Sequence, residues 1–550
     1  MRASTWFQIA GSARLPAVGA VLIGEAEGDN SVEVGIWLNS MYAGVRNHAA
    51  AISSLPLCDR AYVGRDSLDE KFGSDPTVVR AVHAFAERHA LKVVQRSERS
   101  RLIRLSVPLS KVTELFGVRL HNFRMPDGRT YRGRVGEISV SAADFSPEEA
   151  GKIRGVFGLD NRIQAKPFVT VLHSTLKNLR IPYPDYYSLP SDLDGAGQCI
   201  GILEFGNPIA PAIINAHMPG STATFHNIHI SPSAGPSSGI TNLENEVALD
   251  ISTASRVAPK AALAIYFTEK SEYGWIMALD TIIHDTILRP SVLSISWGWA
   301  EQLGIDTGFQ WTRSAIDAVE DLLAEAASCG MTVCVSSGDS GPCTDSGCVG
   351  VYYPASSSFV LSCGGTMIPW RSPGREVVWS NAAGASGGGE SSVIARPKNW
   401  QNTVSPKSRN ILPNPSPGRL LPDVAALAYG SGWDGSPVAG TSASAPLWSA
   451  LLACANQQIQ NHGIAKSVGN INTLLYDISS DLNAAFHDIT DVDNRILQQS
   501  NYYYIATPRW DACSGWGTPI AAEIVAGLLR NAQDQAESRS PRSRGEGPSN

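Results

Sequence analysis

The first 165 residues alternate apolar and polar positions in the way that is typical of a small α+β unit. Between Pro76 and Ala90 the apolar residues recur at helical spacing, which predicts an amphipathic helix. Ser110 is expected to cap a second helix, with Glu114 near its start and Val112, Leu115 and Phe116 facing inward. Strands are expected at 17–24, 32–38, 92–95 and 102–107, and a hairpin at 118–124 and 129–132. These elements predict a compact α+β unit.

From Gln198 onward the pattern changes to short, continuous apolar runs separated by helical stretches. Runs of this kind are buried on both faces, so they indicate a parallel sheet with helices on both sides. The expected strands are 199–205, 262–267, 292–296 and 332–336, and the expected helices are 244–255, 276–285 and 314–328. The predicted fold class of this larger part is therefore α/β. Residues 533–550 are rich in Ser, Arg, Gly and Pro and are expected to be disordered.

Composition is that of a globular chain without features for membranes or nucleic acids. Apolar residues make up 43% and charged residues 17% of the 550 positions, and no apolar run is long enough to span a bilayer. Lys and Arg form no dense stripe with interleaved aromatics, which argues against nucleic-acid binding. We therefore expect neither kind of partner. Residues 1–20 also show no apolar core of a standard secretory signal.

Charge is divided unevenly along the chain. Residues 1–165 hold 22 Lys and Arg against 18 Asp and Glu, whereas the remaining residues hold 22 against 33. A mildly basic first part beside an acidic remainder favours contact between the two parts of the same chain.

The nine cysteines are an odd number, and their spacing matches no zinc pattern. Cys343 and Cys348 flank a short loop and could form a small disulfide. Buried free thiols are an equally good interpretation.

The candidate nucleophile lies in the stretch Gly440-Thr441-Ser442-Ala443-Ser444-Ala445-Pro446. A serine between a turn of small residues and the apolar helical run 447–454 can expose its hydroxyl at a helix N-terminus. The unsatisfied backbone N–H groups at that end stabilise a developing oxyanion. An ordinary serine cap with proline in the first turn explains the same short pattern. The choice depends on which other groups accompany Ser442.

A nucleophilic serine needs a general base, and none of the eleven histidines lies in a His-Gly-x-His motif. Glu246 and Asp250 instead stand four positions apart on an expected helix, so their side chains share one face. Two carboxyls that close, and partly buried, cannot both ionise easily, so one proton can be shared between them. Such a pair can take a proton from serine at acidic pH, where histidine is already charged. A solvated acidic helix face is the alternative.

Three further acids are candidates for a role beside Ser442. Asp339 lies in a Gly-rich turn directly after an apolar strand, where a protonated carboxyl could donate a hydrogen bond to an oxyanion. An Asx turn is the alternative for this residue. Glu244 and Glu301 are less well placed as bases by spacing alone.

Taken together, these stretches resemble the sedolisins, a family of serine-carboxyl peptidases. The matching segments are 246–250, 294–298, 337–341, 353–357 with 363–366, 440–446, and 486–490 with 510–517. Residues 75–165, with 116–121 and 126–131, look like the family's activation prodomain. The resemblance implies a ferredoxin-like α+β prodomain in 1–165, a connector with the processing region in 166–190, a subtilisin-like catalytic domain in 191–532 and a disordered tail in 533–550.

The resemblance also implies a role for each candidate residue. Ser442 is the expected nucleophile, Glu246 the general base, Asp250 its orienting partner and Asp339 the acid that stabilises the oxyanion. Glu204 and Trp297 are expected to extend the hydrogen-bond chain.

One calcium ion near the C-terminus is implied in the same way. The matching ligand positions are Asp488, Ile489, Thr507, Arg509 and Asp511. Two carboxylates and backbone carbonyls suit a cation that prefers oxygen. Thr507 and Arg509 belong to a stretch that replaces a Gly-rich family segment with bulkier residues, so binding depends on whether their carbonyls can curl around the ion.

The implied function is acid-active hydrolysis of peptide bonds by an endopeptidase that is made as a proenzyme. A tripeptidyl-peptidase is the nearest alternative, a non-catalytic relative used for binding is another, and the absent histidine motif disfavours a histidine-based subtilase. The implied partners are protein or peptide substrates and the chain's own prodomain as inhibitor and chaperone, in a secreted or extracellular monomer. Protonation of carboxylates on the acidic part is expected to weaken its hold on the basic prodomain.

Overall fold

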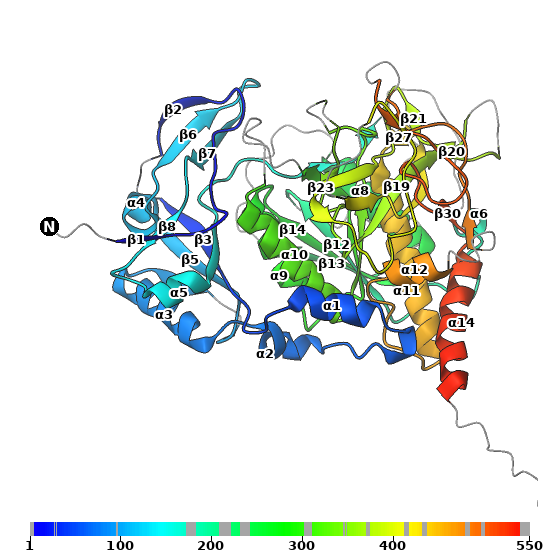
Figure 1. The fold of residues 1–550 in the computed structure, drawn as a ribbon, viewed down its shortest axis with the longest axis horizontal. Helices are drawn as coiled ribbons and strands as arrows, with labels where there is room; N and C mark the ends of the chain where they lie inside the picture. Colours follow the sequence, from blue (N-terminus) through cyan, green and yellow to red (C-terminus); the bar gives the residue numbers. More distant parts are fainter. Residues whose placement is uncertain are drawn as a thin grey trace, which may run out of the picture.

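The chain folds into a smaller N-terminal part and a larger α/β part that lie next to each other along the long axis of the molecule (Figure 1). The structure is a computed structural model. It describes residues 5–539 apart from 27, 29, 95–96, 172–182, 208–221, 231–242, 302–310, 345–346, 348, 370–373, 412–416, 432–436, 479–484 and 497–500.

Four antiparallel strands form the main sheet of the N-terminal part, in the order β4-β5-β3-β9. They are β3 (Ser31–Leu38), β4 (Lys92–Val94), β5 (Leu102–Pro108) and β9 (Ile153–Phe157). Val34, Ile36 and Leu105 of this sheet are fully buried and belong to one core with Val82 of α3 (Pro76–Arg88). The predicted helix and the α+β character of this part are therefore confirmed.

A three-stranded sheet, β2-β6-β7, contains the predicted hairpin. Its strands are β2 (Val21–Glu25), β6 (Leu120–Arg124) and β7 (Thr130–Arg134). The predicted role of Ser110 is wrong, because this residue lies inside the 3₁₀ turn Leu109–Lys111. That turn runs directly into α4 (Val112–Phe116), whose first turn has no side-chain cap.

The larger part is built on a ten-stranded sheet in the order β11-β27-β26-β19-β17-β15-β12-β14-β13, with β20 paired to β19. The strands are β12 (Cys199–Phe205), β13 (Phe225–His229), β14 (Ala262–Thr268), β15 (Val292–Ile295), β17 (Thr332–Ser336), β19 (Leu361–Met367), β26 (Val424–Ser431) and β27 (Pro437–Ala439). From β26 to β13 neighbouring strands run parallel. The predicted parallel sheet is confirmed.

Helices cover both faces of this sheet. The helices α8 (Leu243–Val257) and α11 (Ser444–Asn461) pack on one face, and α9 (Glu272–Ile283) and α10 (Arg313–Ser328) pack on the other. Along β12, Ile200 and Ile202 belong to the core with α8 and α11, whereas Leu203 and Phe205 belong to the core with α9 and α10. This alternation explains why the strand is apolar at nearly every position.

The remaining elements are shorter or peripheral. In the N-terminal part they are β1 (Trp6–Gln8), α1 (Val45–Ser53), α2 (Leu68–Phe72), β8 (Ser139–Ser141) and α5 (Pro147–Lys152). In the rest of the chain they are β10 (Lys166–Pro167), β11 (Thr170–Val171), α6 (Tyr183–Tyr186), β16 (Trp297–Ala300), β18 (Tyr352–Tyr353), β20 (Val377–Val378), β21 (Ser380–Asn381), β22 (Gly384–Ala385), β23 (Gly389–Ala395), β24 (Ser408–Arg409), β25 (Gly418–Leu421), α12 (Asn472–Ile478), β28 (Phe486–His487), β29 (Tyr503–Tyr504) and β30 (Thr518–Pro519).

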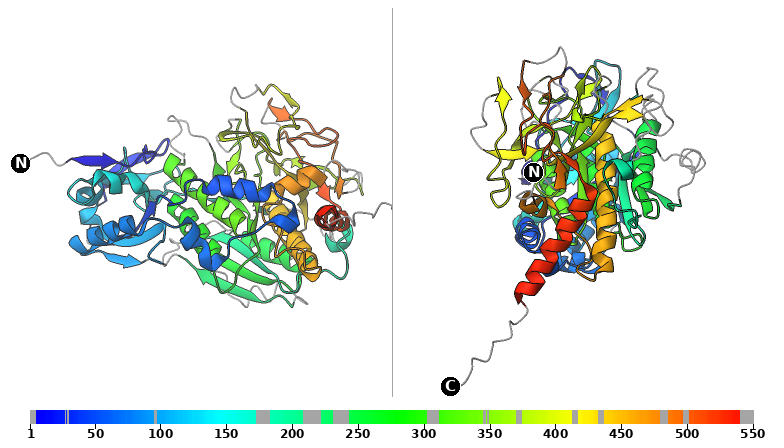
Figure 2. Two further views of the ribbon diagram at one scale, coloured as in Figure 1. Left: turned by 60° about the horizontal axis from the view of Figure 1, so that its bottom comes forward. Right: turned by 90° about the vertical axis from the view of Figure 1, so that its right-hand side faces the viewer.

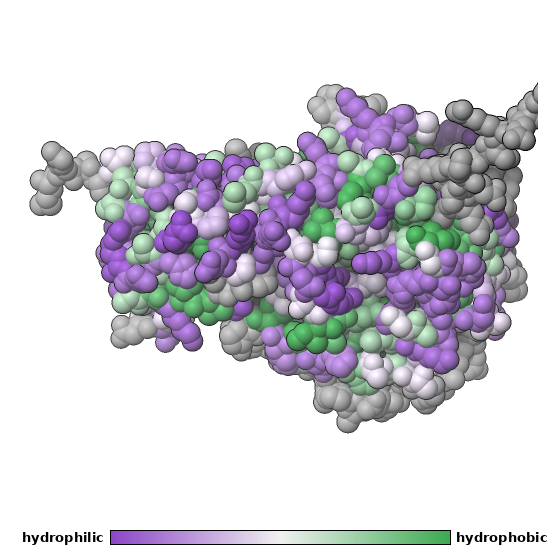
Figure 3. Space-filling model, turned by 90° about the horizontal axis from the view of Figure 1, so that it is seen from below, coloured by the Kyte–Doolittle hydropathy of each residue, from purple (hydrophilic) through white to green (hydrophobic). Residues whose placement is uncertain are grey.

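The C-terminal helix α14 (Ala521–Arg539) lies beside α11 and extends beyond the body of the molecule (Figure 2). It continues past residue 532, so the expected tail does not begin there; residues 540–550 lie outside the described residues. Among the described residues no helix combines the length and apolar character needed to cross a bilayer. Seen from below, the surface is mostly hydrophilic with small, separate apolar patches (Figure 3).

Buried ion pairs join the N-terminal part to helix α10. The Arg101 guanidinium donates to Glu325 Oε1 at 2.8 Å and to Asp321 Oδ2 at 2.7 Å. Arg101 and Glu325 are both buried, and burial raises the pKa of Glu325 whereas Arg101 lowers it. A separate pair links Arg14 to Glu272 Oε2 at 2.8 Å. The basic first part therefore contacts acids of the larger part, as the charge distribution predicted.

We expect Arg101→Met to lower the thermal midpoint of the full chain, because the change leaves Glu325 buried without its cation. Losses from breaking such a pair are about 3–5 kcal/mol. Without Arg101 the pKa of Glu325 rises further, so the carboxyl takes up a proton as the pH falls and the loss shrinks. Calorimetry should therefore show a larger loss near about pH 8 than near about pH 6.

The control is Arg119→Met, whose guanidinium lies 3.5 Å from Glu25 with a side chain that is 71% exposed. It should leave the midpoint nearly unchanged. An equal loss for Arg101→Met at both pH values would contradict the assignment of the effect to the Glu325 charge.

Candidate active site

Ser442 lies in the 3₁₀ turn Thr441–Ala443, between β27 and the N-terminus of α11. The Gly440 N–H donates to the Ala428 carbonyl of the central sheet at 2.8 Å, which fixes the start of the turn. The Ser442 side chain is fully buried, and no side chain caps α11. The alternative of a simple helix cap is therefore wrong for this serine.

The Ser442 hydroxyl donates a hydrogen bond to Glu246 Oε1. Glu246 and Asp250 both lie on α8 and are both fully buried. The alternative of a solvated acidic face on α8 is therefore excluded. The structure brings together the serine and the carboxyl pair that the sequence predicted.

Ser296 is a site residue whose contact the sequence analysis missed. It follows β15, and its hydroxyl donates to Asp250 Oδ1 at 2.9 Å and lies 3.3 Å from the Ser442 carbonyl oxygen. It therefore ties the second carboxyl of the pair to the backbone of the serine turn. Its signals in the sequence were its place at the end of an apolar strand, where α/β sheets position functional residues, and its position in the matching segment 294–298.

Glu204 and Trp297 add a third buried carboxyl to the cluster. The Trp297 indole N–H donates to Glu204 Oε2 at 2.9 Å, and both side chains are fully buried. Glu204 is the penultimate residue of β12, and the charge of Asp250 raises the pKa of Glu204 in addition to burial. Trp297 and Glu204 are therefore in direct contact, but among the described residues no hydrogen bond reaches Glu204 Oε1 to join them to the pair.

Burial raises the pKa of all three carboxyls well above the usual range. For Glu246 the negative charges of Asp250 and Glu204 add to this effect, while the hydrogen bond from Ser442 opposes it. Within the described residues no donor reaches Glu246 Oε2 or Asp250 Oδ2, and both atoms are buried. A pair of this kind retains a proton at a pH where isolated carboxylates have lost theirs.

Asp339 lies in the turn after β17, next to the serine turn. Its Oδ1 atom accepts from the Thr441 N–H at 2.8 Å and from the Thr441 hydroxyl at 2.9 Å. The same hydroxyl accepts from the Gly338 N–H at 3.1 Å. The residue before the nucleophile therefore holds this carboxyl in place, which is more than an Asx turn provides.

Glu301, which the sequence offered as a less well placed base, forms its hydrogen bonds away from Ser442. Glu301 is buried and accepts from the Ser356 hydroxyl at 3.0 Å and from the Ser392 N–H at 3.1 Å. Burial raises its pKa to about 7. The Glu244 side chain and Cys348 lie outside the described residues.

The connector between the two parts of the chain runs through the site. Its residues Lys166–Pro167 pair with β16, and Thr170–Val171 pair with β27. Between these pairings the Ser442 N–H donates to the Phe168 carbonyl at 3.2 Å, and the Phe168 N–H donates to the Ser296 carbonyl at 3.2 Å. The connector therefore lies as an extended strand directly over the serine.

Two glycines allow this close approach. A Cβ atom on Gly440 would lie 1.9 Å from the Phe168 carbonyl oxygen, and its φ of 151° disfavours any side chain. A Cβ atom on Gly298 would lie 2.9 Å from the Phe168 ring. The backbone beside Ser442 therefore leaves room for an extended strand at close range.

Similarity to known proteins agrees with this geometry. Residues 19–162 match the activation domain of pro-kumamolisin, and residues 212–517 match the subtilase family. The chain is 33% identical to kumamolisin from Bacillus sp. (strain MN-32), over 95% of this chain and 96% of that protein. The chain belongs to the sedolisin family. It is accordingly a serine-carboxyl peptidase made as a zymogen.

Other members of the family show the range of this similarity. Sedolisin from Pseudomonas sp. (strain 101) is 28% identical over 72% of this chain and 71% of its own length. Tripeptidyl-peptidase sed5 from Aspergillus fumigatus is 23% identical over 95% of this chain and 97% of its own. A solved structure of Pseudomonas sedolisin covers 65% of this chain and all of its own at a TM-score of 0.53 and 24% identity, which supports the fold.

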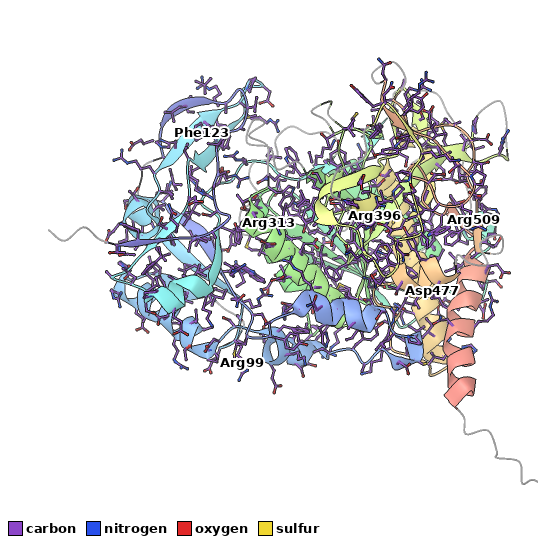
Figure 4. The ribbon with its side chains drawn as sticks, viewed as in Figure 1. Arg99, Phe123, Arg313, Arg396, Asp477 and Arg509 are labelled. Carbon is purple, nitrogen blue, oxygen red and sulfur yellow. The ribbon has the colours of Figure 1, made fainter. Side chains whose placement is uncertain are left out.

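The expected calcium ligands lie on two C-terminal segments, 488–489 and 507–511, which are joined by a hydrogen bond between Asp488 and Arg509. Asp511 is fully buried, and its Oδ2 atom accepts from the Thr507 N–H at 3.0 Å. Asp488 Oδ2 accepts from the Arg509 N–H at 2.9 Å. Burial raises the pKa of both carboxyls, that of Asp511 to about 7. Arg509 has a φ of 70° and lies at the end of the molecule opposite the N-terminal part (Figure 4).

Gly440→Ala should displace the connector from the cleft, because the new Cβ meets the Phe168 carbonyl. In a Ser442→Ala background, which keeps the chain intact, we expect added chymotrypsin to cleave after Phe168 at least about tenfold faster. Mass spectrometry of the fragments measures the effect. The control Gly463→Ala also imposes a side chain at positive φ, 66°, but meets no atom within 4 Å, so the connector should stay protected. Equal protection in both variants would show that the connector is held elsewhere.

Proposed function

We propose that Ser442 attacks the peptide carbonyl while its proton passes to the Glu246–Asp250 pair. The Ser442 N–H and a protonated Asp339 donate hydrogen bonds to the oxygen that becomes negative. The pair then returns the proton to the leaving amine, which leaves an acyl-enzyme on Ser442, and water repeats the same steps to release the acid. Ser296 orients Asp250, and Trp297 orients Glu204 behind the pair.

The position of the Phe168 carbonyl supports this proposal most directly. The Phe168 carbonyl accepts a hydrogen bond from the Ser442 N–H, which is a donor that an oxyanion needs. The hydroxyl of the same serine donates to Glu246, so the Phe168 peptide lies beside it. The connector therefore occupies the place of a substrate. Cleavage between Phe168 and Val169 is the processing step that this arrangement favours, and the prodomain blocks the cleft until it occurs.

An acidic working pH is part of the proposal. Burial raises the pKa of Glu246 and Asp250, and for Glu246 the Asp250 charge adds to this effect, so the pair can hold one proton and one negative charge together. The cleft also receives chain on both sides of the scissile bond, through the β10 and β11 pairings. This continuity favours an endopeptidase over a tripeptidyl-peptidase, which releases three residues from a free N-terminus.

Ser442→Ala should abolish maturation and lower kcat/KM by about 10⁴-fold or more. Glu246→Gln should have an effect of similar size, because the amide cannot accept the serine proton. Both variants and the wild type are incubated in acid, and cleavage of a peptide library is measured across pH. The matched control Ser449→Ala, a buried serine further along α11, should remain active. Cleavage that persists in Ser442→Ala would falsify the site assignment.

Calcium binding by the two segments 488–489 and 507–511 is a second part of the proposal. Asp488 and Asp511 each accept a backbone N–H from residues 507–509, and an oxygen with one such bond keeps a lone pair for a cation. Among the described residues no basic side chain pairs with either carboxylate, and no group of three or more His, Cys, Asp or Glu side chains has an arrangement that could hold a metal ion. Carbonyls of Ile489, Thr507 and Arg509 would complete the ligands, so the ion would stabilise these segments.

Calcium should raise the thermal midpoint of the intact chain, and chelation should lower it. At a free calcium about a hundredfold above Kd the gain is about 2–3 kcal/mol. Asp511→Asn should lose this shift, because the buried amide carries no charge for the cation. Asp491→Asn, an acid at 40% side-chain exposure paired with Arg375, should keep it. A midpoint that does not respond to calcium in the wild type rules the site out.

A further inference from the structure

Tyr352 is a buried aromatic residue of the cleft that the catalytic roles leave unused. It starts β18, which pairs with β16 on the side opposite the connector strand β10. The ring is 1% exposed, and its hydroxyl donates to Ser340 at 3.0 Å. A Cβ on Gly338 would lie 2.3 Å from this ring, so the backbone of the turn that contains Asp339 packs directly against one face of the ring. Tyr352 is therefore held in one position.

The front of the ring contacts Phe168. The two ring centroids are 5.0 Å apart, with an interplanar angle of 66°. Phe168 is buried and lies against Gly298 on the same strand that the connector pairs with. Phe168 precedes the proposed scissile bond and is therefore the P1 residue. Its side chain lies between the Tyr352 ring and the backbone of Gly298.

The hydroxyl end of Tyr352 contacts a second connector residue. The Lys166 ammonium donates to the Tyr352 hydroxyl at 3.1 Å, and it lies 4.7 Å from the Tyr352 ring centroid. Lys166 stands two positions before Phe168 on an extended strand, so the two side chains point to the same face. Pro167 lies between them and points away. Tyr352 therefore contacts two alternate residues of the connector strand, Lys166 and Phe168.

We propose that Tyr352 is a specificity-determining residue for this peptidase. It forms the common wall of the P1 and P3 pockets, and it selects peptides with an aromatic residue at P1 and a basic residue at P3. The inference rests on the proposed function, because it treats the connector as a substrate in place. Edge-to-face ring contacts and cation–π contacts both strengthen when water is excluded, as it is around this buried ring.

The residue after the scissile bond meets a different surface. Val169 is buried in a small cluster with Leu249 of α8 and Ala443 of the serine turn. This cluster does not include Tyr352, so the selectivity we assign to Tyr352 concerns the residues before the scissile bond. The connector sequence from Gln164 to Val171 therefore serves as the reference substrate.

The test compares three internally quenched peptides cleaved by the acid-matured enzyme. The first copies residues 164–171, the second has alanine at the Lys166 position, and the third has alanine at the Phe168 position. For the wild type we expect kcat/KM for the first peptide to exceed each of the others by about threefold to tenfold. Mass spectrometry confirms that cleavage follows the Phe168 position.

Tyr352→Phe separates the two contacts. It removes the hydroxyl that accepts from lysine but keeps the ring, so the preference for lysine should fall by about threefold while the preference for phenylalanine stays. Tyr352→Leu should lose both preferences. The control Tyr503→Phe removes a hydroxyl on β29, outside the β10-β16-β18 sheet, and should change neither ratio.

The outcomes separate this inference from the proposed function. If the wild type cleaves all three peptides equally, or if Tyr352→Phe keeps the full lysine preference, the role of Tyr352 is overturned and the catalytic assignment stands. If no peptide is cleaved at any acidic pH, or if Ser442→Ala cleaves like the wild type, the proposed function itself fails and takes the inference with it. Because Tyr352→Phe keeps the buried ring, this variant still tests the inference if Tyr352→Leu does not fold.

Discussion

The buried carboxyl cluster of Glu204, Glu246 and Asp250 is the constraint on which the rest of the site depends. All three side chains are fully buried, and among the described residues no basic side chain forms an ion pair with them. Raised folded-state pKa values mean that the fold tolerates these groups while they are protonated, and that stability is lost as the pH rises through those values. The stability of the site therefore favours pH values below those pKa values, where the cluster keeps its protons.

In the proposed function, the connector would inhibit through the same geometry that catalysis uses. Gly440 and Gly298 leave room for an extended strand, and the Ser442 N–H binds whichever carbonyl occupies that strand. In the zymogen this carbonyl belongs to Phe168. A substrate must make the same contacts, so the prodomain can exclude substrates without any change in the catalytic groups. The close approach that makes the serine reactive toward peptides is also what allows the chain to block it.

Sequence patterns were sufficient where the relevant residues are neighbours along the chain. The spacing of Glu246 and Asp250 predicts a shared helix face, and the small residues around Ser442 predict a turn before a helix. The contacts of Ser296 and Phe168 could not be predicted, because they depend on the register of β10 against β16 and on how α8 packs over the sheet. The prediction that Ser110 caps a helix was wrong for a related reason, since the 3₁₀ turn that contains Ser110 continues into that helix.

The interface between the two parts shows why a charge difference alone does not explain activation by acid. Arg101 and Glu325 form the opposite-charge contact that the composition predicted. Burial raises the pKa of Glu325 in the zymogen and the Arg101 charge lowers it, so departure of the prodomain would change the two contributions in opposite directions. By linkage, protonation of Glu325 favours the state that binds the proton more tightly. The sign of the charge difference therefore does not by itself set the direction in which acid shifts this contact.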